Sequence, residues 1–286
     1  MKTNNILLTG STGFIGSYFQ NKYKYKYKIS SFSFRTDALE SLDLSSISTI
    51  IHLSSLVHQV REVADEEYIR INITQTINLA KKSKNYGVKH FIFMSTISVY
   101  GIEEGIINDD SPFNPITKYG KSKLKAEQEL LELEDENFKI SIIRPPIVNG
   151  YNAPGNMKKL ITLIDKVWIL PFGEIDNKRS MIYVGNLCHL VDEIVIQEKR
   201  GIFLASDDSE LSTTHLIELI FKNLTKKRYL VKVPFFENLL KKMKPEIHTR
   251  LYKSLIIDNR TTMKTLNIKN IYTIEESILL MMKGEK

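Results

Sequence analysis

Short apolar runs alternate with longer stretches of helical periodicity over the first half of the chain. The runs are almost unbroken apolar segments and predict strands at 5–9, 28–34, 49–53, 91–95 and 139–144. Strands of this kind are usually covered by helices on both faces. The helical patterns between them lie at 14–21, 62–86 and 117–136. This alternation predicts βαβ units and a doubly wound parallel sheet of the α/β class.

The pattern changes after Arg144, where prolines and glycines follow one another closely between 145 and 173. A smaller lobe is expected to begin there. The apolar runs 180–184 and 201–205, with a helical pattern at 186–197, predict a return to the main sheet, and the chain from 212 onward is mostly helical. We therefore expect a main domain of residues 1–150, rejoined by 180–205, and a mostly helical C-terminal lobe made of 151–179 and 206–286.

The composition, 42% hydrophobic and 26% charged, is that of a folded protein. A single cysteine, Cys188, excludes an intramolecular disulfide, and no Cys/His group has zinc-ligand spacing, so we expect no metal and a cytoplasmic location. No apolar stretch approaches the roughly 20 residues of a membrane span, so no membrane insertion is expected. The net charge of +7 is spread along the chain, which argues against a nucleic-acid partner; the dense stretch Lys22 to Lys28 alternates like the entrance of a solvated strand.

Three glycines follow the first predicted strand at a spacing of three, within Gly10-Ser11-Thr12-Gly13-Phe14-Ile15-Gly16. Glycine is required in such a turn because a pyrophosphate must approach backbone N–H groups at a helix N-terminus, where a Cβ would intrude. The strand, turn and helix together predict a Rossmann-type dinucleotide site. The residues expected to contact the dinucleotide are Gly10, Thr12, Gly13, Phe14, Ile15 and Gly16.

The end of the second predicted strand bears on the choice between NAD and NADP. An acid about 20 residues after the glycines normally binds the ribose 2'-hydroxyl. Here the strand ends with Ser33 and Arg35, and no acid appears before Asp37. An arginine can bind a 2'-phosphate, so this pattern favours NADP over NAD and makes Arg35 a candidate cofactor ligand.

Tyr119 and Lys123 stand four residues apart at the start of a predicted helix and so share one of its faces. A cation beside a tyrosine favours the phenolate, which is the form needed for proton transfer near neutral pH. Tyr18 and Lys22 have the same spacing, which shows that the spacing alone is not decisive. Tyr119, however, follows a strand and a loop, so it is predicted at the carboxyl edge of the sheet, where ligands bind in such folds.

These motifs occur in the order and near the intervals of extended short-chain dehydrogenases/reductases, the NAD-dependent epimerase/dehydratase family, which the whole chain resembles. The motifs are the glycine turn, 53–55, Asn72, 95–101, the Tyr119 and Lys123 pair and 144–146. Further stretches resemble the 4-keto reductases and 4-epimerases of UDP-N-acetylhexosamine type from surface-polysaccharide pathways; they are 58–62, 144–150, 155–157 and 177–180. The segment between the second strand and Thr49 is shorter than is usual in this family, and Pro146 stands where many of its epimerases carry asparagine.

The resemblance implies a role for each matching residue. Tyr119 is implied as the acid/base, Lys123 as its activator and ribose ligand, Thr96 as the hydroxyl that orients the sugar 4-oxygen, and Asn72 as the fourth member of the catalytic tetrad. Asn156 and Arg179 match positions that hold the diphosphate of the nucleotide sugar. Further cofactor contacts are implied for Leu53, Ser54, Ser55 and Pro146.

The function predicted from these residues is hydride transfer at C4 of a nucleotide-activated sugar, with a UDP-linked 4-keto hexose as the expected substrate and 4-keto reduction as the expected reaction. The alternative is a UDP-hexose or UDP-N-acetylhexosamine 4-epimerase. A second alternative is a non-catalytic NADP-binding regulatory module, which would normally lack Tyr119 or Lys123. The resemblance also implies a possible homodimer, formed through helices that here would include 62–86 and 117–136.

Overall fold

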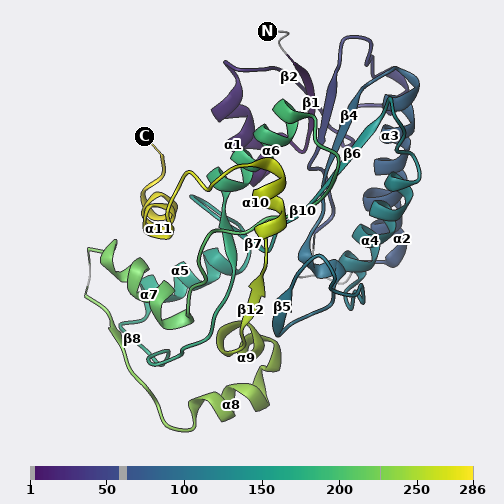
Figure 1. Ribbon diagram of the computed structural model, residues 1–286. Coiled ribbons are helices and arrows are strands. Elements are labelled where there is room, and N and C mark those ends of the chain that lie inside the picture. The colour runs from purple at the N-terminus through teal and green to yellow at the C-terminus, as the bar shows by residue number, and fades with distance from the viewer. Residues whose placement is uncertain (1–3, 58–62, 226, 286) are drawn as a thin grey trace.

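A computed structural model describes residues 4–57, 63–225 and 227–285. Within these residues, six parallel strands form the central sheet in the order β2-β1-β3-β4-β6-β10 (Figure 1). The strands are β1 (Asn5–Thr9), β2 (Lys28–Phe32), β3 (Thr49–His52), β4 (His90–Met94), β6 (Lys139–Arg144) and β10 (Gly201–Leu204). The predicted α/β fold with a doubly wound parallel sheet is confirmed.

Helices cover both faces of this sheet, and alternate residues of one strand enter different cores. On β1, Ile6 and Leu8 pack with α1 (Phe14–Tyr23) and α6 (Val184–Gln197), whereas Leu7 packs on the opposite face with α3 (Gln75–Asn85) and α4 (Lys118–Leu131). Figure 1 shows α3 and α4 together on one side of the sheet. Burial on both faces is the reason why the strands read as continuous apolar runs rather than as alternating ones.

The helix expected at 62–86 is present, but it is not uniformly α-helical. Its first residue lies outside the described residues, and the helical path runs through α2 (Asp65–Tyr68), a π-helical segment (Ile69–Thr74) and α3. The interpretation of Lys22 to Lys28 as a strand entrance holds only for Lys28, the exposed first residue of β2, because α1 extends to Tyr23 and a turn follows it. Lys26 is fixed in that turn by an ion pair with Asp192 on α6.

The strand order reverses between β1 and β3, and ligands bind at such a reversal in open α/β sheets. Only one short 3₁₀ turn (Leu39–Ser41) lies between β2 and β3, because the connection is too short to hold a helix and another strand. As a result β2 forms the edge of the sheet. The glycine turn after β1 and Leu53 after β3 meet where the order reverses.

The apolar run 180–184 does not return to the main sheet, contrary to the expectation. It forms β9 (Met181–Tyr183), which pairs with β7 (Ile147–Asn149) in a separate ribbon; only the run that forms β10 joins β6. Two further ribbons pair segments that are distant in sequence. They are β5 (Gly105–Ile107) with β12 (Leu255–Ile257), and β8 (Ile169–Leu170) with β11 (Tyr229–Leu230).

A second hydrophobic core lies apart from the sheet and is built mainly from residues between 153 and 282. It includes residues of α5 (Asn156–Lys166), α7 (Thr213–Lys222) and α11 (Ile274–Lys283), with α8 (Phe236–Met243) and α9 (Pro245–Tyr252) packed at its margin. From here on, the C-terminal lobe means the described segments that build this core, 153–175, 211–225, 227–253 and α11. A further helix, α10 (Arg260–Leu266), packs beside α6. Among the described residues, no helix combines the length and the apolar composition needed to cross a membrane.

Candidate active site

The glycine turn closes tightly against the neighbouring strand. Gly10 has a φ of +70°, and a Cβ there would lie 2.9 Å from the backbone of Leu53 and Ser54. A Cβ on Gly16 would lie 2.2 Å from the Gly10 carbonyl oxygen, so α1 could not approach the turn with any other residue at that position. No side chain caps the N-terminus of α1, and Gly13, Phe14 and Ile15 line a cavity there. Free N–H donors in a glycine cradle fit the pyrophosphate of a dinucleotide.

This cavity of about 450 Å³ brings together most of the residues singled out in the sequence. Thr96 enters it from the end of β4, and Tyr119 and Lys123 enter from the first turns of α4. The cavity also contacts other predicted residues, which are Gly10, Gly13, Phe14, Ile15, Gly16, Leu53, Ser55, Pro146 and Asn156. Thr12 lines a neighbouring pocket, and Ser54 contributes a backbone N–H that donates to the Thr9 hydroxyl.

The ionisation of the Tyr119 and Lys123 pair is dominated by burial. Burial raises the pKa of Tyr119 to about 12, and a hydrogen bond with Ser55 opposes this rise. Burial lowers the pKa of Lys123 to about 7, and the nearby Glu127 carboxylate opposes this fall. The Lys123 ammonium donates to the Met94 carbonyl oxygen at 2.7 Å and lies 4.2 Å from the centre of the Phe93 ring. In the free protein burial therefore favours the neutral phenol of Tyr119, and Lys123 is the member of the pair whose pKa lies near neutrality.

Asn72 is fully buried behind the cavity and does not line it. It lies in the π-helical segment, and its amide group is engaged on both sides. Its Oδ1 accepts from the Leu56 N–H at 2.7 Å and from the Ser55 hydroxyl at 3.2 Å, while its Nδ2 donates to the Ser122 hydroxyl at 2.9 Å. Asn72 thus connects the loop after β3 to α4, one residue away from Lys123.

Arg35 and Asp37 follow β2 and lie outside the described cavity. Arg35 is exposed, and its backbone N–H donates to the Ser33 hydroxyl at 3.3 Å. The Asp37 side chain turns back toward the strand and accepts from the Ser33 N–H at 2.9 Å. Asp37 lies beyond the end of β2 in the sequence, but its side chain is held at the end of this strand, where a ribose-binding acid is normally found.

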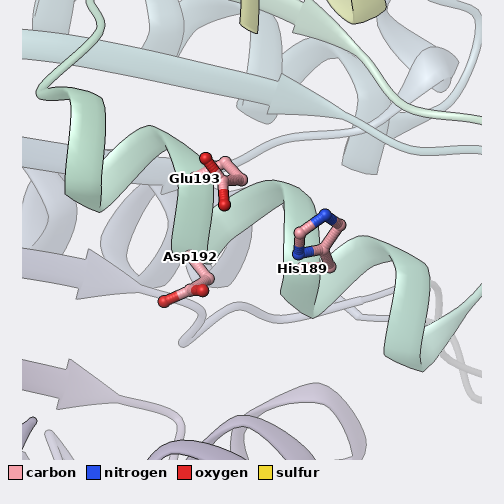
Figure 2. Close-up of side chains that lie close together, drawn as sticks. All are labelled: His189, Asp192 and Glu193. Atoms are coloured by element: carbon pink, nitrogen blue, oxygen red, sulfur yellow. The ribbon is translucent and has the colours of Figure 1, made fainter. Parts of the chain in front are cut away.

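Among the described residues, one group of side chains has the donor atoms of a metal site. His189, Asp192 and Glu193 lie on neighbouring turns of α6, as Figure 2 shows. The Asp192 carboxylate, however, already accepts from the Lys26 ammonium at 2.6 Å and from the Tyr27 hydroxyl at 2.6 Å. A cation would have to displace this ammonium, so we assign no metal to the group.

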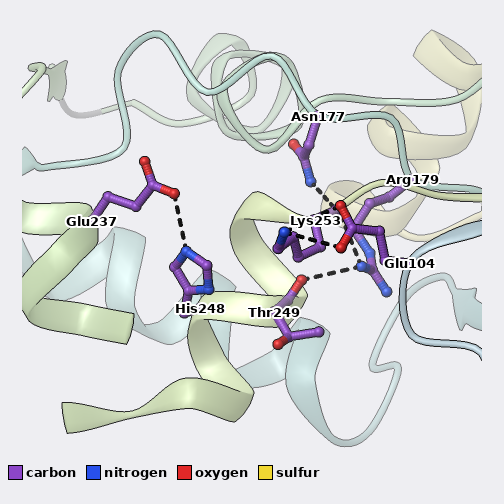
Figure 3. Close-up of polar contacts among 7 residues, drawn as sticks. All are labelled: Glu104, Asn177, Arg179, Glu237, His248, Thr249 and Lys253. Atoms are coloured by element: carbon purple, nitrogen blue, oxygen red, sulfur yellow. Dashed lines mark hydrogen bonds and ion pairs between the residues drawn. The ribbon is translucent and has the colours of Figure 1, made fainter. Parts of the chain in front are cut away.

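Asn156 also borders a second, smaller cavity of about 110 Å³ that Arg179 and Arg250 line. Burial and the neighbouring Arg250 charge lower the pKa of Arg179. The Arg179 guanidinium donates to the carbonyl oxygens of Thr249 on α9, at 3.4 Å, and of Lys253 directly after it, at 3.0 Å (Figure 3). Two guanidinium groups and an amide border this cavity, and its other walls include the apolar side chains of Met157, Leu160 and Leu216. The two guanidinium groups are the part of the lining that would suit a diphosphate.

A model of the NAD dependent epimerase/dehydratase family matches residues 6–203. The chain is 31% identical to the UDP-glucose 4-epimerase of Vibrio cholerae, over 95% of this chain and 92% of that protein. The chain belongs to the NAD-dependent epimerase/dehydratase family. It is also 25% identical to the N-acetyl-alpha-D-glucosaminyl-diphospho-ditrans,octacis-undecaprenol 4-epimerase of Escherichia coli O157:H7, over 81% of this chain and 76% of the relative.

A solved structure supports the fold of this family member. The UDP-glucuronic acid 4-epimerase of Bacillus cereus in complex with NAD superposes with a TM-score of 0.75 at 18% identity, covering 96% of each chain. The protein is therefore an epimerase/dehydratase-family enzyme of the epimerase or reductase type that acts with a nicotinamide dinucleotide. The second alternative, a non-catalytic module, is set aside.

Two features of the site escaped the sequence analysis. Arg250 has no motif that marks it, and only the fold brings α9 to Arg179. The other feature is a buried network behind the cavity, in which Glu127 accepts from the Ser95 hydroxyl and pairs with Arg144, whose Nη1 donates to Tyr100 at 2.7 Å. Glu127 lies one turn beyond Lys123, and this spacing was the available signal.

Proposed function

We propose that the protein is a 4-epimerase of a nucleotide-linked hexose, with UDP as the carrier. The proposal rests on how the two cavities adjoin each other. The first is lined by the glycine turn, Thr96, Tyr119 and Lys123. Asn156 lines both cavities, and Arg179 and Arg250 line the second. A sugar diphosphate bound across this boundary would place its sugar toward Tyr119 and its phosphates toward the arginines.

Each residue has a distinct task in this proposal. Thr96 holds the 4-oxygen, and the Tyr119 phenolate takes the proton of the C4 hydroxyl and later returns it. Lys123 stabilises the phenolate and would contact the ribose of the dinucleotide. The nicotinamide, when bound, would supply the hydride acceptor and donor at C4. The site must also retain the keto sugar while the sugar rotates to present its other face to the hydride. The guanidinium contacts to the diphosphate would hold the sugar nucleotide in place during this rotation.

The end of β2 favours the epimerase over the reductase. An epimerase regenerates its dinucleotide in each cycle and gains from holding NAD permanently, whereas a reductase must exchange a spent cofactor. Asp37, fixed at the end of β2, is suited to the ribose 2'-hydroxyl of NAD. Arg35, exposed beside it, keeps 4-keto reduction with NADPH as the second candidate. Domain boundaries, cytoplasmic location and a homodimer stay predictions.

The test is to mix the purified enzyme with UDP-glucose, UDP-galactose or their N-acetyl forms without added cofactor. Interconversion of the C4 epimers, followed by nuclear magnetic resonance, is the expected result, with NAD released when the protein is denatured. If product forms only from a 4-keto sugar with consumption of NADPH, the protein is a reductase.

Replacing Asp37 by Asn is expected to weaken NAD binding by roughly 10- to 100-fold, the range for a hydrogen bond to a charged group. The asparagine keeps an acceptor for the Ser33 N–H, so the turn should persist. Arg35→Ala is the matched variant, and its affinity for NAD should stay unchanged. Titration calorimetry measures the affinities of the two variants for NAD and for NADP. If Arg35→Ala loses NADP binding while Asp37→Asn keeps its NAD affinity, the reductase is favoured.

Arg250→Ala is expected to raise the KM for the nucleotide sugar by roughly 10- to 100-fold, because a charge-assisted contact to the diphosphate is lost. The dinucleotide affinity should hardly change. Arg179→Ala should also raise KM, but it should lower the melting temperature as well, since it removes the links to the Thr249 and Lys253 carbonyls. Arg260→Ala, at an exposed ion pair with Asp258, is the control. A fall in cofactor affinity in Arg250→Ala would place the diphosphate elsewhere.

A further inference from the structure

Helix α8 carries a stripe of apolar side chains that faces solvent. Phe235 directly before the helix is 83% exposed, Leu239 is 53% exposed and Met243 is 65% exposed. Their spacing of four residues places them along one face of the helix. Ile247 on α9 is also exposed. Contiguous exposed apolar side chains of this kind indicate an interaction surface rather than packing.

Other side chains of α8 fix the helix to the C-terminal lobe, so the orientation of the exposed stripe is set by the fold. The Phe236 ring packs edge-on against Phe172, with ring centres 6.0 Å apart. The Glu237 carboxylate lies 3.0 Å from His248 Nε2 on α9, as Figure 3 shows. Figure 1 shows α8 at the end of the molecule farthest from β1 and β2. The stripe therefore forms an outer face of the lobe.

The charge around this stripe is mostly positive. The segment 227–253 contains eight lysines and arginines but only two acids, Glu237 and Glu246, so it accounts for most of the net charge of +7. Both acids already have a partner, Glu237 the imidazole of His248 and Glu246 the guanidinium of Arg250 at 4.0 Å. This concentration of positive charge is hard to recognise along the chain because the lysines are interleaved with apolar residues.

The lysines closest in sequence to the stripe are Lys241, Lys242 and Lys244. All three are exposed, and the described residues offer them no ion pair. Exposed apolar side chains bordered by unpaired lysines are typical of segments that lie in the interface of an anionic bilayer. The apolar side chains enter the headgroup region and the lysines attract anionic lipids.

We propose that the protein docks reversibly on an anionic lipid surface through Phe235, Leu239 and Met243, with Lys241, Lys242 and Lys244 as the electrostatic contact. This is peripheral binding, because an eight-residue helix is far too short to span a bilayer. Since α9 follows α8 and carries Arg250, docking would bring the arginine-lined cavity close to the membrane. The proposal does not depend on the reaction that the enzyme catalyses.

The experiment is flotation of the full chain with vesicles of phosphatidylcholine alone or with about one third phosphatidylglycerol. We expect binding only to the anionic vesicles and a weakening of this binding as salt is raised. The triple variant Lys241→Gln, Lys242→Gln, Lys244→Gln should bind up to about a hundredfold more weakly, from the contribution of each lysine near the surface. The control replaces Lys28, Lys81 and Lys89, which are exposed on the main domain, by Gln.

A second pair of variants tests the apolar contact. Leu239→Ser with Met243→Ser should lose vesicle binding, whereas Ile196→Ser with Ile271→Ser, at similarly exposed positions elsewhere, should retain it. Circular dichroism and epimerase or reductase turnover with a free nucleotide sugar should be unchanged in all variants, which separates this proposal from the proposed function. Equal losses in variants and controls would overturn the proposal. The proposal would also be overturned if the native chain did not bind vesicles and formed a dimer in light scattering that only the α8 variants dissociate.

Discussion

Tyr119→Phe is expected to reduce turnover by 10²- to 10⁴-fold while the dinucleotide affinity stays within a few-fold. The substitution removes one hydroxyl that transfers the proton at the sugar 4-oxygen, and general acid/base catalysis is typically worth this factor. The phenyl ring keeps the packing at the start of α4. The measurement is single-turnover kinetics together with cofactor titration, so that the chemical step and binding are observed separately.

Tyr18→Phe is the matched control for this variant. Tyr18 also precedes a lysine by four residues, but it lies on α1, and its hydroxyl donates to Glu285 near the C-terminus. Its loss should leave turnover nearly unchanged. If Tyr119→Phe retains more than about a tenth of the rate, or if Tyr18→Phe is the damaging change, Tyr119 is not the acid/base.

Lys123→Met is expected to lose both turnover and dinucleotide affinity. In the free protein, burial holds the pKa of Tyr119 at about 12, and a neighbouring cation is needed to favour the phenolate. Lowering this pKa by about three units corresponds to about 4 kcal/mol, so the loss in rate could approach a thousandfold. Lys121→Met, on the exposed side of the same helix, should be nearly silent.

The stability of the Lys123→Met variant distinguishes a functional role from a structural one. The pKa of Lys123 is lowered by burial to about 7, from an ordinary value of 10.5. Between these values the unfolded chain binds one proton more than the native protein, so the free energy of unfolding contributed by Lys123 rises with pH. Below about pH 7 the buried charge is a cost that the methionine removes.

Thermal melts of the cofactor-free proteins at pH 7 and pH 9 measure this difference. Lys123→Met should be at least as stable as the native protein at pH 7, and the native protein should gain relative to the variant at pH 9. A variant that loses activity and also melts much lower at both values would show that Lys123 has mainly a structural role.

The strands of the central sheet and the glycine turn could be predicted because their signals are local. A strand buried on both faces must be an unbroken apolar run, as at β1 and β4, and the sequence shows this directly. Glycines at positions 10 and 16 are needed because no other residue leaves room for the backbone contacts found there. Tyr119 and Lys123 share a face wherever a helix forms, so their pairing also follows from spacing.

Other features depend on contacts between distant segments, which periodicity does not record. The run 180–184 has the composition of a sheet strand, but composition does not determine which strand it pairs with. In the structure β9, formed by this run, pairs with β7. The position of Asp37 depends on a side chain that folds back to Ser33. Thr12 and Arg35 carry the same signals in sequence as the residues that line the first cavity, yet the fold places them outside it.

The amino-acid sequence by itself determined the fold class, the dinucleotide turn and the Tyr119 and Lys123 pair, because each of these depends on residues close together in the chain. Only the tertiary structure decided that Arg179 and Arg250 share a cavity and that Glu127 stands behind Ser95 and Arg144. It also decided that Phe235, Leu239 and Met243 face solvent. An apolar stripe on a helix predicts burial, and only the fold shows that no other segment of the described chain covers this one.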